Sequence, residues 1–145
     1  MKILNELKME FDSRSVNEGL ARSAISQFAA QLDPTLEELG DIKTAVSEAV
    51  TNAIVHAYPE HIGRVWLRVR VLEGGVLELV VRDRGVGIPN LDEARLPMYT
   101  TGGADRAGMG FTIMDSFMDT LKVRSDQGKG TTVTMRRRVL PRSFR

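Results

Sequence analysis

The chain has 145 residues, which is enough for one compact domain with a single hydrophobic core. It is 42% hydrophobic and 27% charged with a net charge of +1, so composition predicts no overall attraction to nucleic acid or to an anionic membrane. Cysteine is absent and only two histidines occur, which excludes a disulfide framework and argues against structural zinc. No apolar run reaches the roughly 20 residues of a membrane span, and the N-terminus lacks a secretory core. We therefore expect a soluble cytoplasmic protein.

The N-terminal segment predicts a strand followed by a helix. Residues 7–11 alternate between apolar and charged side chains, which is the period of a half-buried strand. Helical spacing of apolar residues then runs from about residue 15 to 31. Ser15 and Glu18 have the spacing of a capping box, so we expect them to cap this first helix.

A second helix is predicted from about residue 34 onward. Asp33 is the expected N-cap, Pro34 fits the first helical turn, and the helix should end before Pro59. Its apolar stripe consists of Leu36, Leu39, Ile42, Val46, Ala49, Val50 and Ala53.

The C-terminal half predicts two hairpins separated by a loop and a helix. Strands at 64–71 and 76–83 are joined by glycines that suit a tight turn. Residues 84–110 have no sustained period, and loops this long in small domains are usually functional or disordered. An amphipathic helix over 111–121 and two strands at 121–125 and 131–139 complete the chain. The predicted fold class is α+β, with helices on one face of a mixed, mostly antiparallel sheet.

One side of the second helix carries polar groups of an unusual kind. Glu48, Asn52 and His56 recur every fourth residue, with Glu48 and Asn52 about 40° apart and pointing away from the apolar stripe. Their neighbours on that side are short and polar: Thr44, Ser47 and Thr51. Such a side leaves room for a small charged ligand, although a solvated helix face is the simpler alternative. We interpret His56 as a structural residue.

A strand exit and a hairpin add possible ligand contacts. Asp83 ends a predicted strand, where its carboxylate is placed to accept a hydrogen bond from an exocyclic amine. Gly85 and Gly87 follow at two-residue spacing and permit unusual backbone angles and close approach to a ligand. Thr131 begins the last strand after a glycine turn. Each of these features is also explained by turn chemistry alone.

The segment "RAGMGFTIM" adds a possible phosphate site. Gly108 and Gly110 are predicted to open a helix, whose N-terminus presents free N–H groups and a positive dipole end. Arg106 lies just upstream, where it can add a charge-assisted contact to a terminal phosphate. A simple glycine entry into a helix is the alternative.

Taken in order, these segments resemble the Bergerat, or GHKL, ATP-binding fold of histidine-kinase catalytic domains, DNA gyrase B and MutL. "EAVTNAIVHAY" is similar to its N box, "DRGVGI" to its first glycine box and "GMGF" to its second. As a free-standing domain over residues 1–145, the chain most resembles the sporulation anti-sigma F factors, a family of anti-sigma serine kinases. That resemblance implies a homodimer that binds a sigma factor (sigma F) and uses ATP to phosphorylate a serine of an anti-anti-sigma protein.

The resemblance also implies roles for individual residues. Asn52 would hold Mg²⁺ beside the phosphates of ATP, and Glu48 would be the catalytic general base for the incoming serine. Asp83 would accept a hydrogen bond from the adenine amine, with Thr131 nearby.

The remaining implied roles concern the phosphates, a lid and the partner. Gly85 and Gly87 would let the backbone pass the base, and Arg106 would contact the γ-phosphate. Residues from about 90 to 108 would form a lid over ATP, and Arg22 would contact a partner protein. Main-chain N–H groups for phosphate would come from Gly108, Met109 and Gly110.

Three other functions remain possible on the sequence alone. A non-catalytic ATP-dependent sigma-binding module would not need Glu48, which argues against it. A general-stress anti-sigma serine kinase would differ only in its partner. A nucleic-acid binder would use the C-terminal arginines, against which the near-neutral charge argues; these are Arg136, Arg137, Arg138, Arg142 and Arg145.

Overall fold

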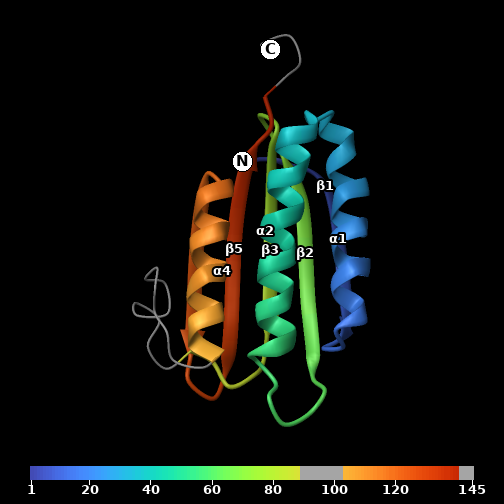
Figure 1. Ribbon diagram of the computed structural model, residues 1–145. Coiled ribbons are helices and arrows are strands. Elements are labelled where there is room, and N and C mark those ends of the chain that lie inside the picture. The colour runs from blue at the N-terminus through green and yellow to red at the C-terminus, as the bar shows by residue number, and fades with distance from the viewer. Residues whose placement is uncertain (89–102, 141–145) are drawn as a thin grey trace.

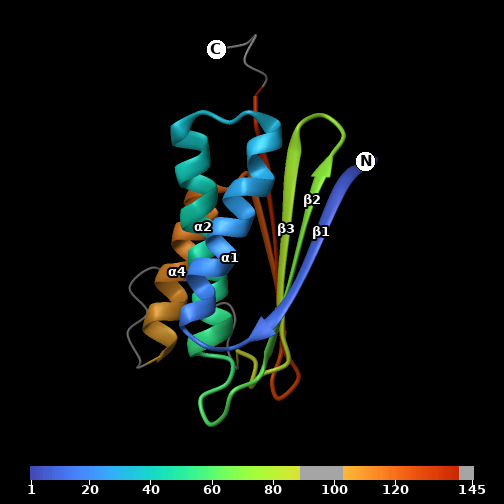
Figure 2. The ribbon, with the colours of Figure 1, turned by 90° about the vertical axis from the view of Figure 1, so that its right-hand side faces the viewer.

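A five-stranded sheet forms one layer of the molecule, and helices cover one of its faces (Figures 1 and 2). The computed structural model describes residues 1–88 and 109–140 in full and the backbone of residues 103–108. The strands are β1 (Ile3–Asp12), β2 (Arg64–Leu72), β3 (Val76–Asp83), β4 (Thr120–Asp126) and β5 (Gly130–Arg138). The helices are α1 (Val16–Ala29), the short η1 (Ala30–Leu32), α2 (Leu36–Val55) and α4 (Gly103–Phe117).

The strand order is β1-β2-β3-β5-β4, and every pair of neighbours among the described strands is antiparallel. The α+β class is therefore confirmed, but the expectation of a mixed sheet is wrong. After β3 the chain crosses through α4 and returns as β4 in the direction of β3. The tight hairpin then places β5 between them, so the two strands of equal direction never become neighbours.

Alternation along the strands separates a buried face from an open face. In β2 the side chains of Val65, Leu67 and Val69 are buried under the helices, whereas Trp66 and Arg68 between them lie on the open face. The hairpin from β2 to β3 turns at Gly74 and Gly75, which both have positive φ, as the sequence predicted.

The helix starts differ from the sequence prediction. Ser15 makes no side-chain cap, since its backbone already has helical angles (φ −55°, ψ −33°), and Glu18 accepts a hydrogen bond from Ser47 on α2. At α2 the N-cap is Thr35: its Oγ1 accepts from the Glu38 N–H at 3.1 Å, and the Glu38 carboxylate accepts from the Thr35 N–H at 2.9 Å. The predicted cap, Asp33, instead adopts a left-handed conformation after η1.

Small side chains allow α2 to lie directly on the sheet. Ala45, Ala49 and Ala53 are buried along it, between the branched side chains of Ile42, Val46 and Val50. Helices α1 and α4 pack on either side of α2, so α2 is the central helix of the layer (Figure 1). It ends at Val55, before Pro59, as predicted.

We predict that Thr35→Ala lowers the free energy of unfolding by about 1–2 kcal/mol, because it removes the capping box of α2. Ser15→Ala is the matched control and should change it by less than about 0.5 kcal/mol, because Ser15 caps nothing. Urea unfolding of both variants measures the difference. Equal losses would contradict this assignment of the caps.

Candidate nucleotide site

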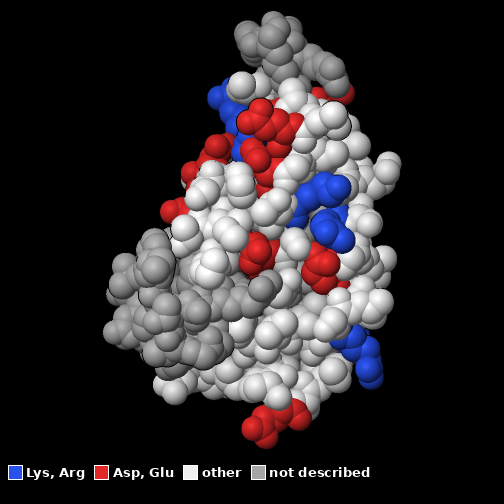
Figure 3. All heavy atoms as spheres, viewed as in Figure 1, with Lys and Arg blue, Asp and Glu red and all other residues white. Residues whose placement is uncertain are grey.

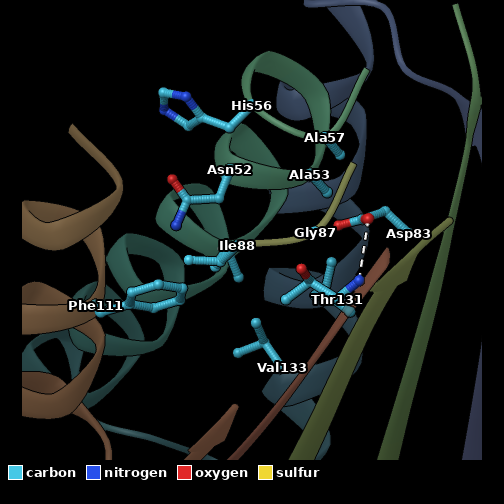
Figure 4. A pocket seen from close by; sticks show the side chains of 12 residues that line it. Asn52, Ala53, His56, Ala57, Asp83, Gly87, Ile88, Phe111, Thr131 and Val133 are labelled. Carbon is cyan, nitrogen blue, oxygen red and sulfur yellow. Dashed lines mark hydrogen bonds between the residues drawn. The ribbon is translucent and has the colours of Figure 1, made fainter. Parts of the chain in front are cut away.

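A pocket lies between the C-terminal half of α2, the end of β3, α4 and β5 (Figure 4). Its cavity measures about 40 Å³, enough to enclose only a small part of a larger ligand. The lining residues are Ala49, Asn52, Ala53, His56, Ala57, Val81, Asp83, Gly87, Ile88, Phe111, Thr131 and Val133. Thus the N-box helix, the first glycine box and Thr131, widely separated in sequence, meet at one place.

Asp83 is the polar group at the floor of the pocket. Its Oδ1 accepts hydrogen bonds from the N–H groups of Gly85 at 2.9 Å and Thr131 at 3.2 Å. Figure 4 shows the other carboxylate oxygen pointing into the pocket. Burial raises the pKa of Asp83 above its ordinary value of 3.8, and the two N–H groups oppose this rise. A buried acceptor with one free oxygen suits a ligand that donates an N–H group.

The first glycine box is tied to the protein backbone on both sides. The Val86 N–H donates to the Ala57 carbonyl at 2.8 Å, and a Cβ at Gly85 would collide with that same carbonyl. Gly87 has a φ of 75° and passes equally close to the backbone of Asp126. Both glycines are thus required for packing inside the protein. Their predicted passage past a base is a separate role and stays a prediction.

The hydroxyl group of Tyr58 joins two backbone segments next to the first glycine box. Its hydroxyl donates to the Arg64 carbonyl at 2.5 Å and accepts from the Arg84 N–H at 2.8 Å. The ring is buried, and a Cβ at Gly63 would overlap it. The segment after α2 is therefore connected to the start of β2 and to the exit of β3, and β3 borders the pocket floor.

The N-box side of α2 lies under α4 rather than in solvent. Asn52 has both amide atoms buried, and neither has a hydrogen-bond partner in the part of the chain that the structure describes. A Cβ at Gly110 of α4 would lie 3.1 Å from Glu48 Oε2 and 3.2 Å from Asn52 Nδ2. A buried amide without partners is costly, so the prediction that Asn52 binds a ligand is consistent with this arrangement and stays a prediction.

Helix α4 begins earlier than the sequence predicted. It starts at Gly103, so Gly108, Met109 and Gly110 lie inside it and do not open it. Inside a helix, N–H groups donate to carbonyls one turn earlier and are not free for phosphate. The proposed lid over 90–108 falls largely outside the described residues, as does the side chain of Arg106.

A groove between α1 and α2 leads to Glu48 from the other side. It is lined by Arg22, Gly40, Lys43, Thr44, Ser47 and Glu48 and has a volume of about 320 Å³. Arg22 is exposed, as predicted, and its Nε lies 3.8 Å from a carboxylate oxygen of Glu18. Glu48 is half-buried and stands where this groove and the buried Asn52 amide come together.

Comparison with known proteins identifies the family. The profile of the histidine kinase-like ATPase domain matches residues 11–137. The anti-sigma F factor of Geobacillus thermodenitrificans is 53% identical over 93% of each chain. That of Pasteuria penetrans is 55% identical over 90% of this chain and 89% of its own. The chain belongs to the anti-sigma F factors of the histidine kinase-like ATPase family. Membership implies that it binds ATP in a kinase-type domain.

Solved structures agree on the fold. The RsbU and RsbW domains of a Mycobacterium tuberculosis protein give a TM-score of 0.70 at 19% identity, covering 93% of this chain and 32% of that one. A blue-light activated histidine kinase of Erythrobacter litoralis gives 0.62 at 27% identity, covering 88% of this chain and 42% of that one. Within the residues described, no helix has the length and apolar character that crossing a bilayer requires.

Sequence reasoning missed several residues of the anti-sigma factor's pocket. The Ser125 hydroxyl shares a hydrogen bond of 2.8 Å with the Thr131 hydroxyl and accepts one of 2.7 Å from the Ile88 N–H. No sequence motif marks Ser125. Phe111 and Ile88 form apolar walls, and each is the last residue of a glycine box, which was an available signal. His56, interpreted as structural, lines the pocket beside Asn52 and also caps α2.

We predict that Asp83→Asn stabilises the nucleotide-free protein increasingly as pH rises above about 4. Because the pKa of Asp83 is raised on folding, the folded state holds this proton more tightly than the unfolded state. The stability that Asp83 contributes is therefore fully present when the pH is below the ordinary pKa of 3.8, and it is lost as the pH rises through the folded-state pKa. Asparagine keeps an oxygen for the two N–H groups and has no charge to bury.

Unfolding free energies from pH 4 to 8, without nucleotide, provide the measurement. Asp115→Asn, at an exposed position on α4, is the matched control. An Asp83→Asn variant that is less stable than the parent at pH 7 would overturn this account of the buried carboxylate.

Proposed function

We propose that the chain is an ATP-dependent serine kinase that binds and inhibits a sporulation sigma factor, sigma F, and phosphorylates the anti-anti-sigma protein opposing it. The position of Glu48 carries this proposal, since its carboxylate lines the open groove between α1 and α2 and lies, like the buried Asn52 amide, against Gly110 of α4. A carboxylate that is open to a groove and close to the proposed Mg²⁺ ligand suits a base that takes a proton from a second substrate. The names of the relatives favour sigma F over a general-stress sigma factor.

Asp83 is proposed to recognise the adenine of ATP. Its free oxygen would accept a hydrogen bond from the exocyclic amine, while its other oxygen keeps the bonds to Gly85 and Thr131. The apolar walls of Ile88, Phe111 and Val133 suit the faces of a flat base. Thr131 would complete this contact through its hydroxyl.

Asn52 is proposed to hold Mg²⁺. Its buried amide oxygen lacks a partner, and an amide oxygen is a suitable ligand for this hard ion. Among the described residues, no three acidic, histidine or cysteine side chains lie together so that they could hold a metal ion by themselves, so Mg²⁺ here would be held mainly by phosphates and water. When bound, Mg²⁺ neutralises charge on the transferring phosphate.

The start of α4 is proposed to rearrange on binding. Phosphate contacts from the N–H groups of Gly108, Met109 and Gly110 require the first turns of the helix, from Gly103, to unwind. Interior glycines weaken a helix by about 0.5–1 kcal/mol each relative to alanine, which makes this rearrangement inexpensive. The same movement would bring Arg106 to the γ-phosphate and close the lid over 90–108.

The transfer itself requires little covalent chemistry from the protein. The serine oxygen of the anti-anti-sigma protein forms a bond to the γ-phosphorus, and the bond from that phosphorus to ADP breaks. Glu48 accepts the hydroxyl proton. The acceptor segment would approach along the groove between α1 and α2, with Arg22 and Lys43 contacting the partner. A cytoplasmic homodimer completes the proposal.

We predict that Glu48→Gln retains ATP affinity but slows phosphorylation by about 10²–10⁴-fold, because it removes only the proton acceptor. Glu37→Gln, an exposed acid in the first turn of α2, is the control with the same change of charge. Transfer of γ-labelled phosphate to a purified anti-anti-sigma protein is the readout. Phosphorylation by Glu48→Gln at the parental rate would disprove the assignment of the base.

We also predict that Asp83→Asn weakens ATP binding by about 10–100-fold, because an amide N–H₂ would then face the donor of the base. Calorimetry with ATP and with GTP measures the effect. The loss should be larger for ATP; an unchanged ATP affinity would mean that the base binds elsewhere.

A further inference from the structure

The open face of the sheet carries a group of cations that the kinase proposal does not use. Arg82, Arg84, Arg124 and Lys129 surround a shallow depression of about 280 Å³ at the end of β3, β4 and β5, lined also by Thr132. We call these four cations the open-face cluster. By contrast, the helix-covered face shows acidic and basic side chains in small separate groups (Figure 3).

The open-face cluster differs from the other cations of this face because it has no acidic partners. Toward the opposite end of the strands, Glu78 is buried between Arg136 at 2.7 Å and Arg68 at 3.8 Å, so those charges are compensated. Within residues 1–88 and 109–140, no ion pair joins the open-face cluster to a carboxylate. Two carboxylates line the depression: that of Asp126, and that of Asp83, which is buried and accepts hydrogen bonds from Gly85 and Thr131. Uncompensated like charges repel one another, and an anionic ligand relieves that repulsion.

Trp66 holds two of these cations in place. The guanidinium groups of Arg82 and Arg84 each lie 4.9 Å from the centre of its ring. A stacked guanidinium keeps its N–H edge free for a carboxylate, and its restrained position reduces the entropy lost on binding. Because the ring is already in contact with both cations, it is not a free platform for stacking nucleobases, as single-stranded nucleic acid binding requires.

The cluster lies directly behind the nucleotide pocket. Successive residues of a strand point to opposite faces, so Arg82 and Thr132 line the depression and not the pocket. Asp83 and Thr131, their neighbours in sequence, line both. A ligand at the cluster therefore leaves the groove between α1 and α2 open, and both surfaces can be occupied at once.

We propose that the open-face cluster is a docking site for an acidic segment of a partner protein, separate from the groove at Glu48. Carboxylate side chains spaced along an extended peptide bind the guanidinium edges of Arg82 and Arg84, with Arg124 and Lys129 adding charge at the rim. The site requires neither ATP nor phosphoryl transfer, so it stands independently of the kinase proposal.

The test measures binding of a fluorescent peptide of alternating glutamate and aspartate to the full chain at about 0.15 M salt, where long-range attraction is screened. Its glutamine–asparagine counterpart is the neutral probe. We expect the acidic peptide alone to bind, and Arg82→Gln/Arg84→Gln to weaken it by about tenfold or more. Lys2→Gln/Arg14→Gln removes the same charge at exposed positions elsewhere and should weaken it less than about twofold.

Three results would overturn the proposal. The first is that the acidic peptide does not bind, and the second is that both double variants lose the same amount of peptide affinity. The third is that a single-stranded oligouridylate binds more tightly than the acidic peptide and that Arg82→Gln/Arg84→Gln abolishes this binding. Thermal unfolding is the control that both double variants are folded. A third variant, Arg82→Lys/Arg84→Lys, is a conservative substitution at the same two positions. It keeps the charge without the planar fork, and a docking site that uses this fork should show intermediate affinity. Full parental affinity in that variant would count against the carboxylate geometry.

Discussion

The close approach of α2 to the sheet is the contact on which the rest of the structure depends. Ala45, Ala49 and Ala53 bring the helix axis near β3, and this proximity sets the depth of the pocket beside it. The opposite side of α2 is then covered by α4, which buries Asn52. A larger side chain along the alanine row would lift the helix and separate Asn52 from Asp83. The spacing of the two groups is thus a property of the core packing.

Elements with a clear hydrophobic period were predictable from the sequence. The strands at 64–71 and 76–83, the end of α2 and the hairpin glycines were all located closely. The directions of the strands were not, since the pairing of β3 with β5 connects residues far apart in the chain. Local motifs also misled where a tertiary contact competes: Glu18 has the right spacing to cap α1, but its carboxylate bonds to Ser47 instead.

Helix α4 illustrates a second limit of sequence reasoning. Two glycines within three residues favour a helix start, yet the helix runs through both of them from Gly103. The structural reason is at Gly110, where any Cβ would press on Glu48 and Asn52. Of the site residues predicted from the sequence motifs, Asn52, Asp83 and Thr131 line the pocket, whereas Glu48 lines the groove between α1 and α2. The apolar walls and Ser125 needed the three-dimensional arrangement, because their contacts carry no distinctive spacing.

The double hydrogen bond of Tyr58 has a consequence for how the pocket widens. The hydroxyl joins the backbone at Arg64 and Arg84, so the end of α2, β2 and the exit of β3 move as one block. Helix α4, which meets the pocket through Phe111, takes no part in these two bonds and does not belong to the sheet. We therefore expect the cavity to widen mainly by displacement of α4, with the floor staying in place. A partner that contacts α4 would then respond to the width of the pocket, whereas one on the floor side would meet the same surface in either state.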